Sequence, residues 1–214
     1  MKFLINFATR SRPSKYHACI KNLRECFTDY KVLLKVDRDD PYVRDYFETV
    51  YEEVIIKLGY SESKVHAINR DIPADGWDVL INTSDDVQWL KIAGSVIEKS
   101  AQPDLFLHFP EAYAESQAKK QRRPSTCVVS IMDRIYYNRF GYVYNPEYIS
   151  LYCDNEATEV ARKLGRYKFV PIVICEHLHP VTGKVKTDDQ YRYTQSFAQE
   201  DKTTFIRRRN FNFK

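Results

Sequence analysis

Apolar runs alternate with amphipathic stretches along the first part of the chain. Residues 3–8 form an apolar run that predicts a buried strand. Helical spacing of the next apolar residues predicts a helix through Tyr16, Ile20, Leu23 and Phe27. Residues 30–36 predict a second strand. This strand–helix–strand order is typical of an α/β layer fold.

The middle of the chain continues the alternation. Apolar residues three or four positions apart, followed by Gly59, predict a second helix, and they are Val43, Phe47, Val50, Val54 and Leu58. Residues 64–67 predict a short strand, and residues 77–82 predict a nearly continuous apolar strand. A further helix is predicted through Leu90, Ala93, Val96 and Ile97.

Beyond Pro103 the pattern changes. Strands are predicted over residues 104–109 and 126–132, with a polar, basic segment between them. A helix over 154–164 ends at Gly165, and a last strand covers 168–175. The tail from Asp188 onward is polar and aromatic. Because there is no internal repeat and no linker, we expect a single domain over residues 1–214.

Composition narrows the class of protein. The 214 residues are 43% hydrophobic and 29% charged, which is typical of a folded globular chain. No apolar run is long enough to cross a bilayer, and the N-terminal apolar stretch is too short for a signal peptide. Five scattered cysteines without a Cys-x-x-Cys pair favour a reducing, cytoplasmic location. The net charge of +4 permits an anionic partner without requiring one.

Polar clusters follow three of the predicted strands. These clusters are residues 9–12 (TRSR), 37–40 (DRDD) and 84–86 (SDD). In an open α/β sheet, ligands bind beyond the carboxyl ends of the strands, so the three clusters are expected at one edge. Basic groups suit phosphates, and carboxylates suit a divalent cation that bridges those phosphates. A single acidic turn can equally be a solvated loop or a helix cap.

The order of the motifs resembles that of the GT-A class of nucleotide-sugar glycosyltransferases. The matching stretches are 7–13 (FATRSRP), 36–40 (VDRDD), 64–70 (KVHAINR), 77–86 (WDVLINTSDD), 152–156 (YCDNE) and 176–180 (EHLHP). The resemblance implies a GT-A type, Rossmann-like mixed sheet flanked by helices. It also implies a nucleotide-sugar-binding half over residues 1–100 and an acceptor-binding half over residues 101–214.

The resemblance further implies which residues bind the donor, for which a UDP-sugar is expected. They are Thr9, Arg10, Arg12, Asp37, Lys64, Asn69, Arg70 and Asp85. Thr9, Arg10 and Asp37 would line the nucleoside pocket, with Asp37 accepting a hydrogen bond from the base. Lys64, Asn69 and Arg70 would reach the base, the ribose or the diphosphate. Asp85 would touch the ribose or the water shell of a metal ion.

A metal site is implied around the acidic turn. Asp86 would be the principal carboxylate on Mn²⁺ or Mg²⁺, which would stabilise the charge of the departing nucleoside diphosphate. The family's usual Asp-x-Asp motif is altered here, because its first position is Ser84. A histidine after the last predicted strand would complete the metal shell, and imidazole is an acceptable ligand for Mn²⁺. His177 is the preferred candidate, while strand alternation leaves His179 open.

Inverting transfer needs a base that takes the proton of the acceptor hydroxyl. Asp154 lies at the start of a predicted helix, where the dipole favours a carboxylate. It is therefore the candidate base, with Glu156 in reserve. The alternative for Asp154 is a helix cap without a catalytic role.

The acceptor is less constrained. Basic segments at Lys119–Arg123 and Arg207–Arg209, with neighbouring aromatic residues, suit phosphates and stacked bases. Compact enzymes of this type resemble those with which bacteriophages glycosylate hydroxymethylated pyrimidines in DNA, for which a base must be exposed. We therefore expect DNA as acceptor. Two alternatives are a transferase for a cell-surface saccharide or small molecule, and a non-catalytic nucleotide or nucleic-acid binding module.

Overall fold

The computed structural model describes residues 1–111, 115–116, 119, 125–178, 180 and 185–214. Its strands are β1 Phe3–Ala8, β2 Tyr30–Asp37, β3 Val54–Gly59, β4 Val79–Asn82, β5 Val87–Trp89, β6 Phe106–His108, β7 Ser130–Asp133, β8 Tyr167–Phe169 and β9 Cys175–His177. Its helices are α1 Pro13–Cys26, α2 Lys64–Asn69, α3 Ala93–Ser100, α5 Arg134–Asn138, α6 Cys153–Lys163, α7 Asp189–Ser196 and α8 Ala198–Asn210, with a 3₁₀ turn at Asp45–Phe47.

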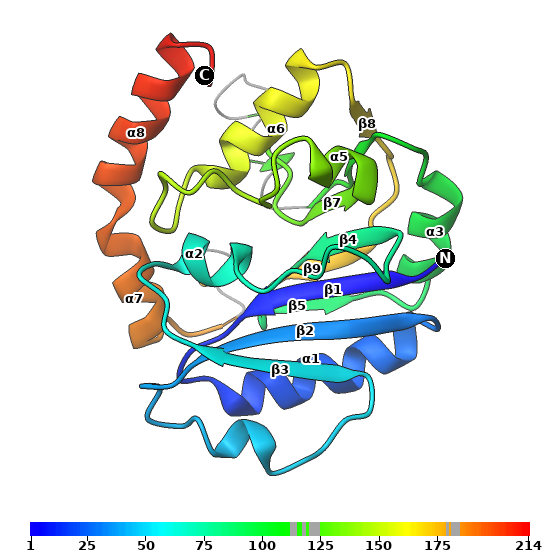
Figure 1. The fold of residues 1–214 in the computed structure, drawn as a ribbon, viewed down its shortest axis with the longest axis vertical. Coiled ribbons are helices and arrows are strands. Elements are labelled where there is room, and N and C mark those ends of the chain that lie inside the picture. The colour runs from blue at the N-terminus through cyan, green and yellow to red at the C-terminus, as the bar shows by residue number, and fades with distance from the viewer. Residues whose placement is uncertain (112–114, 117–118, 120–124, 179, 181–184) are drawn as a thin grey trace.

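A seven-stranded mixed sheet forms the centre of the fold (Figure 1). Its order is β3-β2-β1-β4-β7-β6-β8, in which β3, β2, β1 and β4 run parallel and β7 runs antiparallel to β4. A separate antiparallel pair joins β5 to β9. Because β5 starts directly after the acidic turn, this pair brings residues near 177 beside residues near 86.

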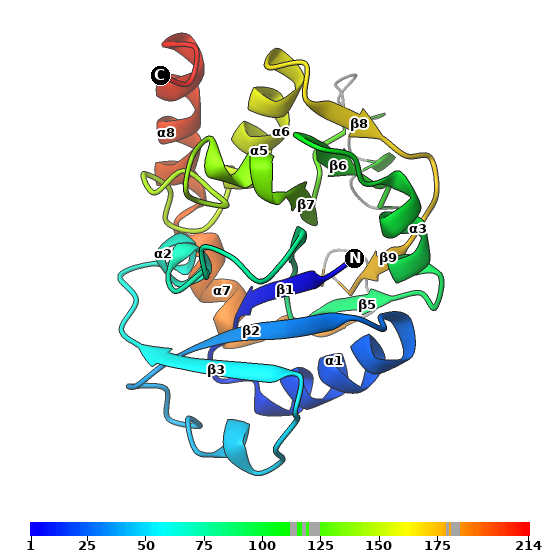
Figure 2. The same cartoon turned by 45° about the vertical axis from the view of Figure 1, so that its right-hand side comes forward.

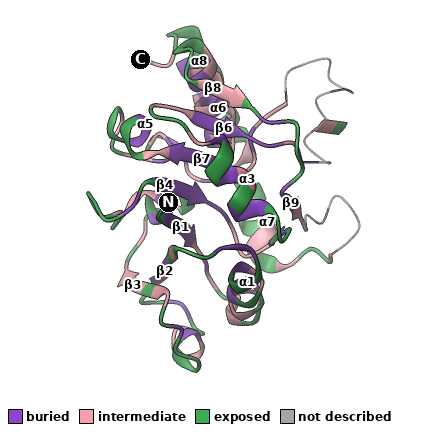
Figure 3. Cartoon of the chain, turned by 90° about the vertical axis from the view of Figure 1, so that its right-hand side faces the viewer, coloured by how far each residue is buried: buried purple, intermediate pink, exposed green. Residues whose placement is uncertain are grey.

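The two faces of the sheet are covered by different helices (Figure 2). One face packs against α1 and α3, and its core includes Phe7, Tyr16 and Ile97. The other packs against α2, α5, α6 and α8. The central strands are buried on both faces, as Figure 3 shows, which explains their nearly continuous apolar sequence. The predicted α/β fold, a mixed sheet flanked by helices in one domain, is confirmed.

The helix predicted through residues 43–58 is wrong. This segment forms a 3₁₀ turn and then the edge strand β3. Val54, Ile56 and Leu58 pack against the core, while Ile55 between them is exposed, so the true period is two. Val50, which fitted the helical spacing, is 88% exposed.

Two other predicted strands also differ. Residues 64–67 belong to α2, because the Ser63 side chain caps the helix by accepting a hydrogen bond from the His66 amide. The single strand predicted over 168–175 is two short strands in different sheets, β8 and β9. The polar tail from Asp188 forms α7 and α8, which sequence periodicity did not reveal. Among the described residues, no helix is long and apolar enough to cross a membrane.

Candidate active site

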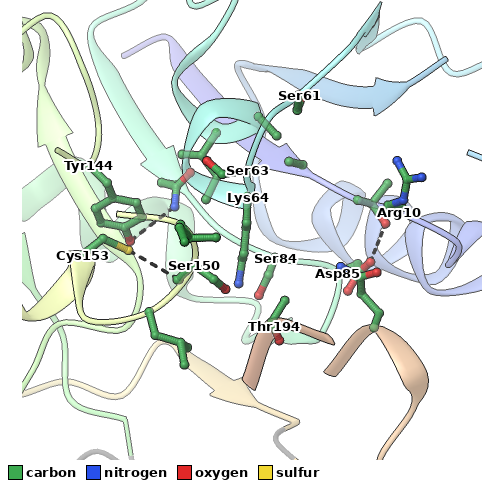
Figure 4. A pocket seen from close by; sticks show the side chains of 18 of the residues that line it. Arg10, Ser61, Ser63, Lys64, Ser84, Asp85, Tyr144, Ser150, Cys153 and Thr194 are labelled. Atoms are coloured by element: carbon green, nitrogen blue, oxygen red, sulfur yellow. Dashed lines mark hydrogen bonds between the residues drawn. The ribbon is translucent and has the colours of Figure 1, made fainter. Parts of the chain in front are cut away.

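A pocket of about 780 Å³ lies at the carboxyl ends of β1, β2 and β4. Its other walls come from residues 61–68, residues 149–155 and α7. Of the residues predicted to bind the donor or the metal or to act as the base, Asn69, Arg70 and the reserve base Glu156 do not line it, and His179 lies outside the described residues; the others line it. Figure 4 shows Arg10, Lys64, Ser84 and Asp85 around this space, with Thr194 of α7 beside them. The three polar clusters at the strand ends are thus brought together.

Within the acidic turn, Asp85 is directed towards the residues after β1. Its Oδ2 accepts a hydrogen bond of 2.6 Å from Thr9 Oγ1, and its Oδ1 lies 3.1 Å from Arg12 Nη1. Burial raises the pKa of Asp85, which the Arg12 charge opposes and the Asp86 charge reinforces. Arg12 also contacts Asp188, the N-cap of α7, at 2.5 Å. Arg12 therefore links the acidic turn to the helix that closes one side of the pocket.

Asp86 is directed towards β9 instead. Val87 is paired with His177 across the small sheet, which places His177 Nε2 3.4 Å from Asp86 Oδ1. The Ser84 hydroxyl donates to the same carboxylate oxygen. Burial opposes ionisation of Asp86, but the hydrogen bonds from His177 and Ser84 and the Lys64 charge together hold its pKa below the usual range. Asp86 is therefore an anion held at the pocket wall.

The pair of Asp86 and His177 is a small donor set for a metal ion. Over the described part of the chain, no cluster of three or more His, Cys, Asp or Glu side chains is arranged as metal ligands. However, Mg²⁺ bound with a phosphate substrate commonly takes only one or two protein carboxylates. One carboxylate and one imidazole also suit Mn²⁺. The residues present thus fit a divalent cation whose remaining ligands are phosphate oxygens and water. His179, the other candidate, lies outside the described residues.

Asp154 lies at the start of α6 and lines the pocket. Tyr152, two residues before Asp154, adopts a left-handed backbone conformation with φ of 60°, which is strained for a residue other than glycine. Burial raises the pKa of Asp154, although Lys64 and His177 act in the opposite direction. A carboxylate with a raised pKa next to a pocket has the properties of a general base.

Glu156, the reserve candidate, does not line the pocket. Its oxygens accept hydrogen bonds from Arg208 at 2.8 and 2.9 Å and from the Tyr148 hydroxyl at 2.8 Å. Both Glu156 and Arg208 side chains are 6% exposed. The reserve assignment is therefore corrected, because this carboxylate joins α6 to α8.

The pocket wall near β2 contains an acceptor without a partner. Arg10 contacts Asp37 Oδ2 at 3.2 Å and binds Asp39 through two hydrogen bonds of 2.9 and 3.0 Å. Asp37 Oδ1 is buried and has no hydrogen-bond partner in the described structure; Arg70 Nη2 is 3.7 Å away. Such an orphaned carboxylate oxygen is costly unless a ligand donates to it.

Asn69 and Arg70 do not line the pocket, and their side chains bind other parts of the protein. The Asn69 side chain makes three hydrogen bonds with the backbone of Val143 and Tyr144. The Arg70 guanidinium donates to the Ser61 hydroxyl and the Val36 carbonyl. Both therefore support the pocket walls from behind.

Sequence patterns also missed pocket residues. Lys35, Asn82 and Tyr144 line the pocket, although the first two belong to strands predicted only as buried. The sequence did contain a signal for Lys35 and Asn82, because each is a polar residue within an otherwise apolar strand. Tyr193, Thr194 and other residues of α7 also line it, and their segment had no clear periodicity.

Of the two basic segments predicted to bind phosphates, the one near the C-terminus forms ion pairs within the protein. Arg207 and Arg208 form ion pairs with Glu147, and Arg209 pairs with Glu159. In the other basic segment, Lys119 is exposed, and residues 120–123 lie outside the described residues. The arginines near the C-terminus are therefore engaged within the protein.

Comparison with known proteins supports the fold. No protein-family model matches the sequence, and a search of curated proteins finds no significant match. Among solved structures, the mannosyltransferase PcManGT from Pyrobaculum calidifontis, in complex with GDP-Man and Mn²⁺, aligns with a TM-score of 0.66 at 14% identity. TarS from S. aureus aligns with a TM-score of 0.59 at 10% identity, both in complex with UDP and in complex with UDP-GlcNAc. The chain has the fold of GT-A glycosyltransferases.

The alignments cover 82% of this chain. They cover 56% of PcManGT and 58–60% of these TarS chains. The chain thus spans rather more than half the length of the glycosyltransferases that it matches. A shared fold does not by itself establish an activity, so the chemistry has to be argued from the pocket.

Proposed function

We propose that the protein transfers a sugar from a nucleoside-diphosphate sugar to an acceptor hydroxyl with the help of Mn²⁺ or Mg²⁺. The observation that supports this most directly is the convergence of Asp86, His177 and Asp154 on one pocket of a glycosyltransferase fold. An anionic carboxylate beside an imidazole suits a cation, while a carboxylate with a raised pKa suits a base.

The donor is proposed to be a nucleotide sugar, with a UDP-sugar as the first choice. Complexes of the matching structures contain GDP-Man, UDP or UDP-GlcNAc. In this chain, Asp37 Oδ1 is a buried acceptor that an N–H group of the base would satisfy. Arg12 and Lys64 supply positive charge on the pocket wall for the diphosphate.

In the proposed reaction, the bond between the anomeric carbon and the diphosphate oxygen breaks as the acceptor oxygen bonds to that carbon. Asp86 and His177 would hold the divalent cation, which would supply positive charge for the leaving diphosphate. Asp154 accepts the proton of the acceptor hydroxyl. A single displacement of this kind inverts the configuration at the anomeric carbon.

For the acceptor, the described residues favour a hydroxyl of a saccharide or small molecule over one in DNA. The arginines that suggested a polyanion are already paired with glutamates. A neutral acceptor does not require a basic surface of this kind. The remaining basis for a DNA acceptor, the segment Lys119–Arg123, is mostly outside the described residues.

One experiment tests the proposal. The protein is incubated with Mn²⁺ and a panel of UDP- and GDP-sugars, with saccharides, small alcohols or hydroxymethylcytosine-containing DNA as acceptors, and products are detected by mass. Transfer to a saccharide or alcohol that is abolished by Asp154→Asn supports the proposal. Transfer to DNA alone would overturn the acceptor assignment. Binding of a nucleotide sugar without hydrolysis or transfer would favour a non-catalytic binding module.

A further inference from the structure

A row of buried polar side chains crosses four adjacent strands beneath the pocket. The row consists of Lys35 on β2, Asn6 on β1, Asn82 on β4 and Ser130 on β7, whose exposed fractions are 1%, 0%, 4% and 0%. In the register of the sheet, Asn6 is paired with Asn82, which is paired with Ser130. Since side chains alternate along a strand, all four share the sheet face that carries Leu4, Leu33 and Leu80 and packs against α2.

Hydrogen bonds connect the row to the end of α2. Lys35 Nζ donates to Asn6 Oδ1 and, at 3.0 Å, to the carbonyl of Ile68. Asn6 Nδ2 donates to the same carbonyl at 3.1 Å and to Asn82 Oδ1 at 2.9 Å. The Ile68 carbonyl belongs to the last turn of α2, where four carbonyls lack partners within a helix.

The same row reaches the acidic turn and the opposite wall. Asn82 Nδ2 donates to the Tyr144 hydroxyl at 3.4 Å, and Ser130 Oγ lies 3.1 Å from that hydroxyl. Asn82 is also the last residue of β4, two positions before Ser84. The row therefore joins α2, which begins with Lys64, to the strand that leads into the acidic turn Ser84, Asp85 and Asp86.

Packing alone does not account for Lys35. A leucine or methionine would fill this site without the cost of removing an amine from water. Lys35 and Asn82 both line the pocket. Burial of the Lys35 amine thus costs stability. Its hydrogen bond to the end of α2 holds a helix that forms part of the pocket wall.

We propose that Lys35 is a positioning residue for nucleotide binding, which, through Asn6, fixes α2 and the acidic turn in their relative places. This inference rests on the proposed function for the identity of the ligand. Lys35 acts on Lys64 through α2 and on Asp85 and Asp86 through β4. Its positioning role is argued from its own hydrogen bonds, which go to Asn6 and to the Ile68 carbonyl.

The charge of Lys35 provides a specific signature. Burial lowers the pKa of Lys35 from 10.5 to about 7; the Arg70 charge adds to this effect and Asp71 opposes it. Asp37 follows on the same strand, while the partner of Lys35 on β1 is the uncharged Asn6, which in turn binds the uncharged Asn82 of β4. The folded state binds this proton less tightly than the unfolded state. Lys35 therefore destabilises the fold fully below pH 7, and the cost decreases as the pH rises from about 7 towards 10.5.

The test compares the wild type with Lys35→Met, Lys35→Gln and the control Lys31→Met. Lys31 is on the same strand and the same sheet face, but it is exposed and bonds to the Glu52 carbonyl. Binding of UDP and of GDP, each with Mn²⁺, is measured by calorimetry between pH 6 and 9. Amide hydrogen exchange is measured in parallel over residues 65–70 and 82–86.

For Lys35→Met we expect the nucleotide Kd to rise about tenfold, which is about 1.4 kcal/mol, and exchange in α2 to become faster. Lys35→Gln retains an N–H donor and should recover most of the affinity, while Lys31→Met should match the wild type. From pH 7 to 9.5, the free energy of unfolding of the wild type should increase relative to that of Lys35→Met.

An unchanged Kd and unchanged α2 exchange in Lys35→Met would overturn the proposal. If the wild type binds neither nucleotide, the proposed function fails, and the exchange data alone decide whether Lys35 positions α2. If Lys35→Met does not fold, Asn6→Ser interrupts the same row. Wild-type exchange in that variant would overturn the proposal, and faster exchange in α2 would support it.

Discussion

The protein contains two clusters of buried charge that differ in how completely their hydrogen bonds are satisfied. Between α6 and α8, Arg208 and Glu156 bind each other through two hydrogen bonds, and no buried side-chain atom of either lacks a partner in the described structure. Around the pocket, Asp37 Oδ1 and Arg12 Nε are buried without hydrogen-bond partners, although Arg70 Nη2 lies 3.7 Å from Asp37 Oδ1. Both clusters are ionic, but of the two only the pocket cluster has buried donors or acceptors that a ligand could still bind. Unsatisfied buried atoms also occur away from the pocket, for example on Tyr16, Trp89 and His108, so it is their coincidence with charged groups that distinguishes the pocket from the cluster between α6 and α8.

The largest effect should come from the candidate base. Asp154→Asn removes the proton acceptor, and we expect kcat to fall by about 10³-fold with the melting temperature nearly unchanged. The control is Glu159→Gln on the same helix, whose carboxylate pairs with the exposed Arg209 at 3.1 Å. Steady-state kinetics with the best donor measure the change. An asparagine variant as active as the control would remove Asp154 from the mechanism.

Asp86→Asn comes next, because it neutralises the candidate cation ligand. We expect kcat/KM to fall on the order of 10²-fold, together with a higher concentration of Mn²⁺ needed for half-maximal activity. Addition of EDTA to the wild type should abolish transfer and Mn²⁺ should restore it. Asp75→Asn, at an exposed site, serves as control. Full activity of the Asp86 variant in EDTA would contradict the metal role.

For the satisfied cluster, the expected loss is in stability. Arg208→Met leaves the buried Glu156 with the Tyr148 hydroxyl but without its cation, which should lower the free energy of unfolding by about 3 kcal/mol. Arg207→Met removes an ion pair whose arginine side chain is 52% exposed, so its cost should be below about 1 kcal/mol. Urea unfolding measures both, and activity per folded molecule should stay unchanged. If both variants lower the free energy of unfolding equally, the buried ion pair of Arg208 is no more important for stability than the exposed pair of Arg207.

Asp37→Ala should have a smaller effect, confined to nucleotide affinity. Loss of the unpartnered acceptor should raise the Kd for UDP about tenfold, or about 1.4 kcal/mol. Asp29→Asn, exposed at the other end of β2, is the control. Calorimetry without a sugar acceptor isolates this binding step. The assignment of Asp37 to the base is untenable if its variant binds UDP as the control does.

The smallest effect concerns pH. Because the base acts when deprotonated, kcat/KM should rise with pH through the raised pKa of Asp154 and then level off. Lys64 lowers that pKa, so Lys64→Met should move the acid limb to higher pH. A profile of kcat/KM recorded from pH 4.5 to 8 gives the shift of the acid limb, separately from any change in the maximal kcat/KM. An acid limb that stays in place, or moves to lower pH, would mean that Lys64 does not stabilise the Asp154 carboxylate.

Burial explains which parts of the fold were predictable from sequence. β1 and the centre of β4 are buried on both faces and have apolar runs, so the strands predicted at 3–8 and 77–82 are confirmed. The edge strand β3 is only partly buried, and its apolar positions coincide by chance with helical spacing across a turn. The short helix α2 is marked by its Ser63 cap rather than by periodicity, so it was predicted as a strand.

The candidate site was predictable where motifs follow strands, and less so elsewhere. Asp37, Asp85 and Asp86 all line the pocket because parallel strands end at a common edge. Asn69 could not be distinguished from a ligand-binding residue, since its partners at residues 143–144 are known only from the tertiary structure. Lys35 was missed because periodicity assigns a strand to one environment and overlooks a single polar residue inside it.

The pairing of β5 with β9 also has a consequence for dividing the chain. Asp86 lies in the first half of the chain, and His177 reaches it only when Cys175–His177 joins Val87–Trp89. β1 and β4 are likewise joined over a long separation, since Phe3 is paired with Val79. Closing each of these loops costs chain entropy, which the pairings have to offset. A fragment that ends before β9 would therefore keep Asp86 but lack the imidazole beside it.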